Sequence, residues 1–116
     1  MVTFKCDPQE LQRVQDELRR KPFNSGVGVL HEPSGQIFLA PFDDVPGGHA
    51  DLVQQLNLPP SECKGFAIVL QPDGSPTAVN SSHLNGTQGS PGSLQMPQAT
   101  FDAIVDTLRD AGLGQP

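Results

Sequence analysis

Two histidines in glycine- or serine-rich segments are the side chains of this sequence best suited to acid–base chemistry. His49 follows Gly47 and Gly48, and His83 follows Ser82. Imidazole is the only side chain whose unperturbed pKa lies near neutrality, so it can accept or donate a proton under ordinary conditions. We therefore take His49 and His83 as the candidate acid and base of a catalytic site.

His49 stands at the start of an expected short helix. Backbone N–H groups and the positive end of the helix dipole favour an anion there, and they keep a nearby imidazole neutral and able to accept a proton. Gly47 and Gly48 would then line a binding site, and Asp51 would orient a ring. The alternative is that Gly48 caps the helix, Asp51 complements the dipole and His49 faces solvent.

His83 follows the second of two expected hairpins, among short polar side chains. It could act as the second acid or base, or it could orient a phosphate or a ribose hydroxyl, with Asn80 and Asn85 as binding residues. Ser82 is a weaker candidate, as a nucleophile, because the sequence has no Gly-x-Ser-x-Gly elbow. The alternative is that residues 80–82 form a turn whose polar side chains satisfy the backbone. The third histidine, His31, is expected to be packed or at the rim of the core.

Metal and cofactor sites have little support in the sequence. A zinc deaminase needs His-x-Glu and a Pro-Cys-x-x-Cys pair, whereas this chain has Asp51 after His49 and only Cys63 in the later segment. Asp43, Asp44 and Asp51 could hold a divalent cation weakly, but acidic residues on a loop are usually solvated. No phosphate-binding glycine loop follows a strand and opens a helix. We predict no metal site and no cofactor.

Length and charge restrict the class of protein. A chain of 116 residues is long enough for one modest core, which predicts a single domain over 1–116. The net charge is −6, with seven Lys and Arg and no Trp or Tyr, so a basic stripe and an aromatic platform for nucleic acid are missing. A protein partner with a basic surface fits this charge better, and a small-molecule substrate stays open.

No segment has the length and hydropathy of a membrane helix, and the N-terminal residues lack the apolar stretch of a signal peptide, so we expect no membrane association. The cellular compartment stays open. Cys6 and Cys63 could form a disulfide in an exported protein or remain thiols in the cytosol.

The elements that would position the histidines come from two similar stretches. Residues 26–35 and 65–74 both have an apolar run followed by Pro-x-Gly, the pattern of a β-hairpin. Helical spacing of apolar residues predicts three helices around these hairpins. The expected elements are a helix over 8–21, strands over 26–31 and 36–40, a helix over 49–57, strands over 65–70 and 75–80, and a helix starting at Pro97.

This order predicts an α+β fold, α-ββ-α-ββ-α, with an antiparallel sheet of about four strands and the helices packed on one face. The two hairpins align without gaps, which admits a duplicated ββα unit. Residues 81–96 form a long polar connection that we expect to be mobile.

The layout also resembles the C-terminal domains of bacterial polymorphic toxins and related secreted effectors. The residues that carry the resemblance are Gly48–Leu52, Gly65-Phe66, Ser81–Asn85 and Thr107–Leu113, and the resemblance as a whole covers about residues 26–113. In such families a histidine before the short helix and a polar residue after the later strand line one pocket, which by resemblance points to His49 and His83. Many of these toxins are basic and cut nucleic acid, so the acidic charge here implies a nucleotide-type molecule or a protein as the target.

Two functions therefore stand as hypotheses. The first is an effector-type enzyme in which His49 and His83 act as acid and base across one cleft. The second is a non-enzymatic immunity or adaptor protein whose acidic surface binds a basic partner. The first requires both imidazoles to share one concave pocket, and the second makes no such demand.

Overall fold

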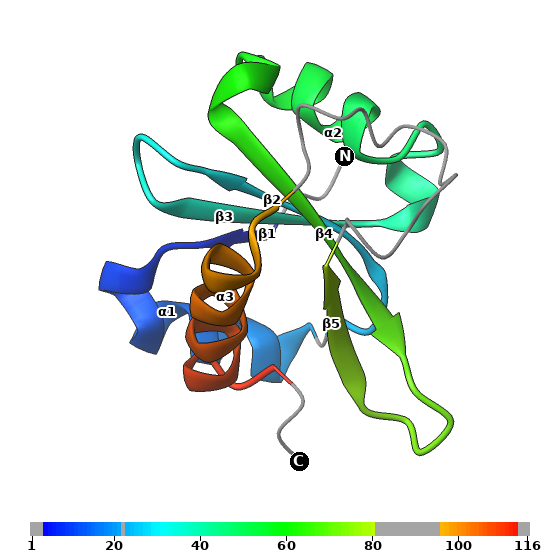
Figure 1. Cartoon of the computed structure of the whole chain (residues 1–116). Coiled ribbons are helices and arrows are strands. Elements are labelled where there is room, and N and C mark those ends of the chain that lie inside the picture. The colour runs from blue at the N-terminus through cyan, green and yellow to red at the C-terminus, as the bar shows by residue number, and fades with distance from the viewer. Residues whose placement is uncertain (1–3, 22, 81–95, 114–116) are drawn as a thin grey trace.

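The computed structural model describes residues 4–21, 23–80 and 96–113, and over these residues it shows one antiparallel sheet with helices around it (Figure 1). The strands are β1 (Phe4–Cys6), β2 (Gly26–His31), β3 (Gln36–Pro41), β4 (Cys63–Leu70) and β5 (Pro76–Asn80). The α-helices are α1 (Leu11–Arg20), α2 (His49–Leu56) and α3 (Gln98–Asp110). Short 3-10 turns are formed by Pro8–Glu10, Phe42–Asp44 and Pro60–Glu62. The α+β class is confirmed.

Both expected hairpins are present, as β2–β3 and β4–β5. Their first strands lie side by side at the centre of the sheet, antiparallel, with Val29 opposite Gly65. The strand order is β1-β3-β2-β4-β5. Gly35 and Gly74, in the two hairpin turns, have φ of 73° and 90°, a backbone conformation that glycine adopts without strain.

The sheet has five strands where about four were expected. The additional strand, β1, pairs with β3 at one edge, with Phe4 opposite Leu39. Three residues are too few to show an alternating pattern, so the sequence gives no local signal for this strand.

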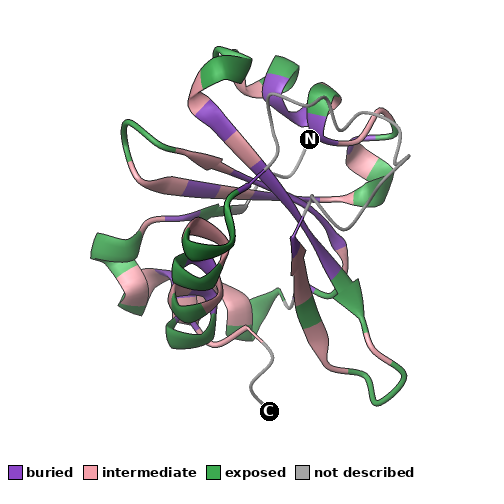
Figure 2. Cartoon of the chain, in the orientation of Figure 1, coloured by how far each residue is buried: buried purple, intermediate pink, exposed green. Residues whose placement is uncertain are grey.

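Helices cover both faces of the sheet, and the prediction that they pack on one face was wrong (Figures 1 and 2). The reason lies in the central strands, where residues 26–29 and 65–68 are buried without alternation. A strand that is apolar on both sides needs cover on both sides.

Two separate cores result. The core on the α1/α3 side contains Cys6, Val14, Phe23, Ile37, Leu39, Phe66, Ile68, Met96, Ile104, Leu108 and Ala111. The core on the α2 side contains Val27, Val29, Ala40, Val45, Leu52, Val53 and Cys63. Because Cys6 and Cys63 belong to opposite faces, they are two buried free thiols in this structure.

Candidate functional site

His49 is completely buried, with 0% of its surface exposed, at the first position of α2. Its Nε2–H donates a hydrogen bond to the carbonyl oxygen of Phe66 in β4. The ring lies over Gly65, where an added Cβ would come within 2.9 Å of its Cδ2 atom. The histidine therefore joins the start of α2 to β4, next to the centre of the sheet.

Burial lowers the pKa of His49 below its ordinary value, and the hydrogen bond to Phe66 opposes this effect only in part. The ring is thus neutral at neutral pH, as expected from the sequence. The cause is desolvation in the core, however, and the ring is removed from solvent. A proton transfer to a substrate requires the substrate to reach the ring, which this burial does not favour.

Gly47, Gly48 and Asp51 form the entry into α2. Gly48 has φ of 74°, a conformation that favours glycine. The Asp51 carboxylate accepts hydrogen bonds from the backbone N–H of Gly47 at 3.3 Å and from Nε2 of Gln55 at 3.0 Å. These contacts hold the loop and the first turn of α2 together, and Gly48 is the N-cap of the helix as the structural alternative for this segment expected. That alternative also expected His49 to face solvent, which was wrong, because the ring is completely buried against Gly65 and Phe66.

Asn80 lies on the opposite face of the sheet from His49. It stands directly across from Phe66, whose side chain belongs to the α1/α3 core, and directly opposed residues share a face. Its Nδ2 donates to the carbonyl oxygen of Met96 at 3.2 Å, which links the end of β5 to the segment before α3. The structure therefore does not bring Asn80 and His49 together.

The remaining predicted site residues, Ser82, His83 and Asn85, lie outside the described residues. A shared site of His49 and His83 stays a prediction.

An exposed aromatic side chain among acidic residues marks the surface beside α2. Phe42 is 47% exposed and is followed by Asp43 and Asp44 in the turn after β3. The Nε2 of Gln55 in α2 donates two hydrogen bonds, one to the backbone carbonyl oxygen of Asp44 at 3.3 Å and one to the carboxylate of Asp51. We call Phe42, Asp43, Asp44 and Asp51 the Phe42 surface.

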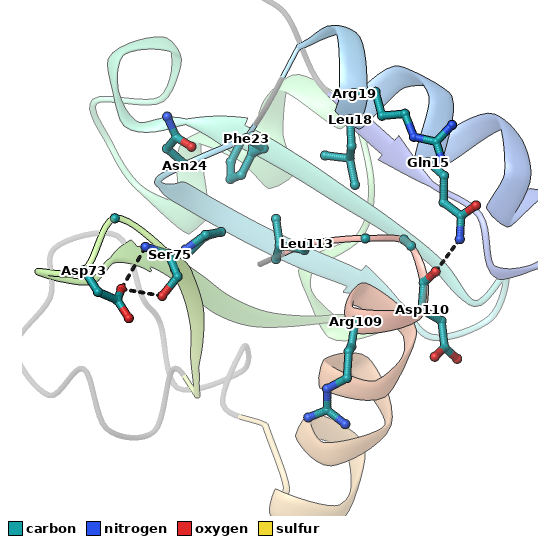
Figure 3. A pocket seen from close by; sticks show the side chains of 14 residues that line it. Gln15, Leu18, Arg19, Phe23, Asn24, Asp73, Ser75, Arg109, Asp110 and Leu113 are labelled. Atoms are coloured by element: carbon teal, nitrogen blue, oxygen red, sulfur yellow. Dashed lines mark hydrogen bonds between the residues drawn. The ribbon is translucent and has the colours of Figure 1, made fainter. Parts of the chain in front are cut away.

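A groove of about 780 Å³ lies on the other side of the molecule, where the C-terminal ends of α1 and α3 approach the β4–β5 turn (Figure 3). Apolar side chains in it include Leu18, Phe23 and Leu113. Its charged lining residues are of both signs, namely Arg19, Arg109, Asp73 and Asp110. The Nε2 of Gln15 donates to the carbonyl oxygen of Asp110 at 2.6 Å and so joins α1 to the end of α3.

Neither the Phe42 surface nor the groove was identified from the sequence. The groove combines residues from three distant segments, so no local pattern could indicate it. The Phe42 surface did have a signal, because Phe42 stands next to two aspartates in a short segment between Pro41 and Pro46.

Over the described ranges, no three His, Cys, Asp or Glu side chains are grouped closely enough to hold a metal ion. Over the same ranges, none of the helices has the length and apolar character needed to cross a membrane. Comparisons of the chain with protein-family models, with curated proteins and with solved structures give no match.

Proposed function

We propose that this chain is a protein-binding module whose Phe42 surface docks onto a basic patch of a partner protein. The observation that carries the proposal is the exposed Phe42 ring, which is followed in the chain by Asp43 and Asp44. Gln55 ties this turn to α2, because its Nε2 donates to the backbone carbonyl oxygen of Asp44 and to the carboxylate of Asp51. An aromatic anchor with charged residues around it is the usual composition of a protein–protein contact. This is the role of an immunity or adaptor protein.

The distribution of charge supports a basic partner. Between residues 22 and 63 the sequence has five acidic residues, Glu32, Asp43, Asp44, Asp51 and Glu62, and no lysine or arginine. Glu32 pairs with Lys64 at 3.9 Å and Glu62 contacts His31, whereas Asp43, Asp44 and Asp51 belong to the Phe42 surface. The charge of the Phe42 surface is therefore of one sign, which attracts a basic surface and speeds the encounter with it.

Two other functions have weaker support. The groove has two arginines and two aspartates in its lining, so it favours no particular charge in a ligand. The effector-type enzyme needs an accessible imidazole, whereas His49 is buried and bonded to the Phe66 carbonyl. The toxin-like layout is equally compatible with an immunity protein, which acts by binding.

The test is a titration of the ¹⁵N-labelled protein with a synthetic peptide of alternating lysine and leucine, followed by NMR. We expect shift changes concentrated at residues 42–51 and binding that weakens as salt is added. The Phe42→Ala variant should bind about tenfold more weakly, because a buried aromatic anchor contributes more than 1 kcal/mol or so to such contacts.

The matched control is Asp102→Asn, which removes one exposed carboxylate from α3, on the other side of the sheet. It should leave the affinity close to that of the wild type, while Asp43→Asn lowers it. Equal losses from both variants would mean that the peptide responds to net charge alone, and the proposal would fail.

A further inference from the structure

A serine, a histidine and a glutamate are joined by hydrogen bonds at the end of the first hairpin. The Oγ of Ser34 lies 2.7 Å from Nδ1 of His31, and Nε2 of the same ring lies 2.8 Å from Oε1 of Glu62. This is the order of contacts in a nucleophile–base–acid triad, in which a carboxylate orients the imidazole that activates a hydroxyl.

The fold holds the three residues in this arrangement. His31 is the last residue of β2, and its carbonyl oxygen accepts the N–H of Gly35 at 2.8 Å, which closes the turn that carries Ser34. Glu62 comes from a distant segment and is fixed beside β2 by its carbonyl oxygen, which accepts the N–H of Glu32 at 2.9 Å. The His31 side chain is 15% exposed, whereas Ser34 is exposed.

The contacts also define the direction of proton transfer. A carboxylate only accepts hydrogen bonds, so Nε2–H of His31 donates to Glu62 and the lone pair of Nδ1 faces Ser34. The Ser34 hydroxyl has another acceptor, the carbonyl oxygen of His31, but at the longer distance of 3.4 Å. The N–H of Gln36 donates to the same Oγ at 3.3 Å, which favours negative charge on that oxygen.

We infer that Ser34, His31 and Glu62 form a nucleophilic site for acyl transfer from small activated esters, a function separate from the proposed binding surface. Ser34 Oγ attacks the acyl carbon as its proton passes to Nδ1 of His31, and the C–O bond to the leaving group breaks. The leaving group takes this proton and departs as an alcohol or phenol. Water then attacks the carbonyl carbon of the acyl-serine while His31 accepts a proton from it, the bond between that carbon and Ser34 Oγ breaks, the acyl group departs as a carboxylic acid, and His31 returns the proton to Ser34 Oγ.

The class of substrate follows from the position of the site. Ser34 stands on an exposed turn, so a small ester can approach it without a tailored cleft. An ester with a good leaving group needs the least stabilisation of the departing oxygen, which makes aryl esters the simplest case.

The test measures hydrolysis of p-nitrophenyl acetate by the full chain and locates the acetyl group by peptide mass mapping. We expect acetylation of Ser34, and a loss of rate of about 100-fold in Ser34→Ala and in His31→Gln, the size of a general-base contribution. Ser75→Ala is the matched control. Ser75 lies in the turn of the second hairpin, where its Oγ donates to Asp73 at 2.6 Å and Leu70 stands in place of His31.

Glu62 positions the imidazole of His31, and its role is tested by separate variants. Glu62→Ala should lower the rate, and Glu62→Gln should restore part of it, because an amide oxygen accepts the same hydrogen bond from Nε2. Thermal unfolding of each variant separates these effects from loss of the fold. An unchanged rate in folded Ser34→Ala, or acetylation mapped only to other residues, would overturn the inference.

Discussion

The imidazole of His49 occupies the space that a side chain at Gly65 would fill, and its Nε2–H donates to the carbonyl oxygen of the next residue, Phe66. A histidine expected to take part in catalysis thus serves as a contact between α2 and β4. The buried Nε2–H group has a hydrogen-bond acceptor in the backbone, and this bond makes the complete burial of the ring tolerable.

This contact predicts strong coupling between positions 49 and 65. Gly65→Ala alone should destabilise the protein by about 1–3 kcal/mol, because the new methyl group would overlap the ring. His49→Ala alone should cost about 2–4 kcal/mol, through the cavity and the lost hydrogen bond. In the double variant the methyl group enters the vacated space, so the loss should be smaller than the sum.

Urea unfolding of the wild type, both single variants and the double variant measures this coupling. Gly35→Ala is a useful reference, since its added Cβ has no neighbour within 4 Å and any loss reflects the φ of 73° alone. Strictly additive losses at positions 49 and 65 would show that the ring does not lie over Gly65.

The buried imidazole also predicts a pH dependence of stability. In the unfolded chain the ring takes up a proton near its ordinary pKa of 6.5, whereas burial lowers the pKa of His49 in the folded protein. Below pH 6.5 the unfolded state therefore binds more protons, and stability falls as the pH decreases. Well above that pH the ring is neutral in both states, and this residue adds no pH dependence.

Free energies of unfolding at several pH values between about 5 and 8 measure the effect for wild type and His49→Gln. Glutamine keeps an N–H donor for the Phe66 carbonyl but does not titrate, so its stability should fall less over the same interval. Parallel curves for the two proteins would contradict a buried neutral ring at position 49.

The two thiols should be nearly unreactive in the folded protein. Burial raises the pKa of Cys6 to about 11, and it also raises the pKa of Cys63, with Glu62 and Glu32 adding to the effect. Since the thiolate is the reactive form, a disulfide reagent at pH 8 should modify both slowly in buffer and rapidly in urea. Fast modification before unfolding would show that one of the thiols reaches the surface.

Local patterns predicted the elements well. The helix expected over 8–21 is a 3-10 turn over Pro8–Glu10 followed by α1 from Leu11, and the Asp7 carboxylate caps that turn by accepting the N–H of Gln9 at 2.9 Å. The Pro-x-Gly segments placed both hairpins, and their glycines, Gly35 and Gly74, have the positive φ that such turns need. Each of these patterns consists of a few adjacent residues, so it can be recognised in the sequence without knowledge of the fold.

The arrangement of the elements was less predictable. The apolar runs of β2 and β4 predict strands, and the lack of alternation in these runs is a sign that both faces of the sheet are covered. The position of His49 depends on a glycine sixteen residues away in β4, and such a pairing appears only when the chain is folded. The same is true of Glu62, which approaches His31 through the pairing of β2 with β4.

Each central strand contains a glycine beneath a ring: Gly65 lies under His49, and Gly28 lies under Phe66 on the opposite face. A larger residue at either position would overlap the ring unless the ring residue is replaced by a smaller one. Descendants of this sequence should therefore show correlated exchanges at 28 with 66 and at 49 with 65. Such paired substitutions would identify distant homologues whose overall sequence identity to this chain is low.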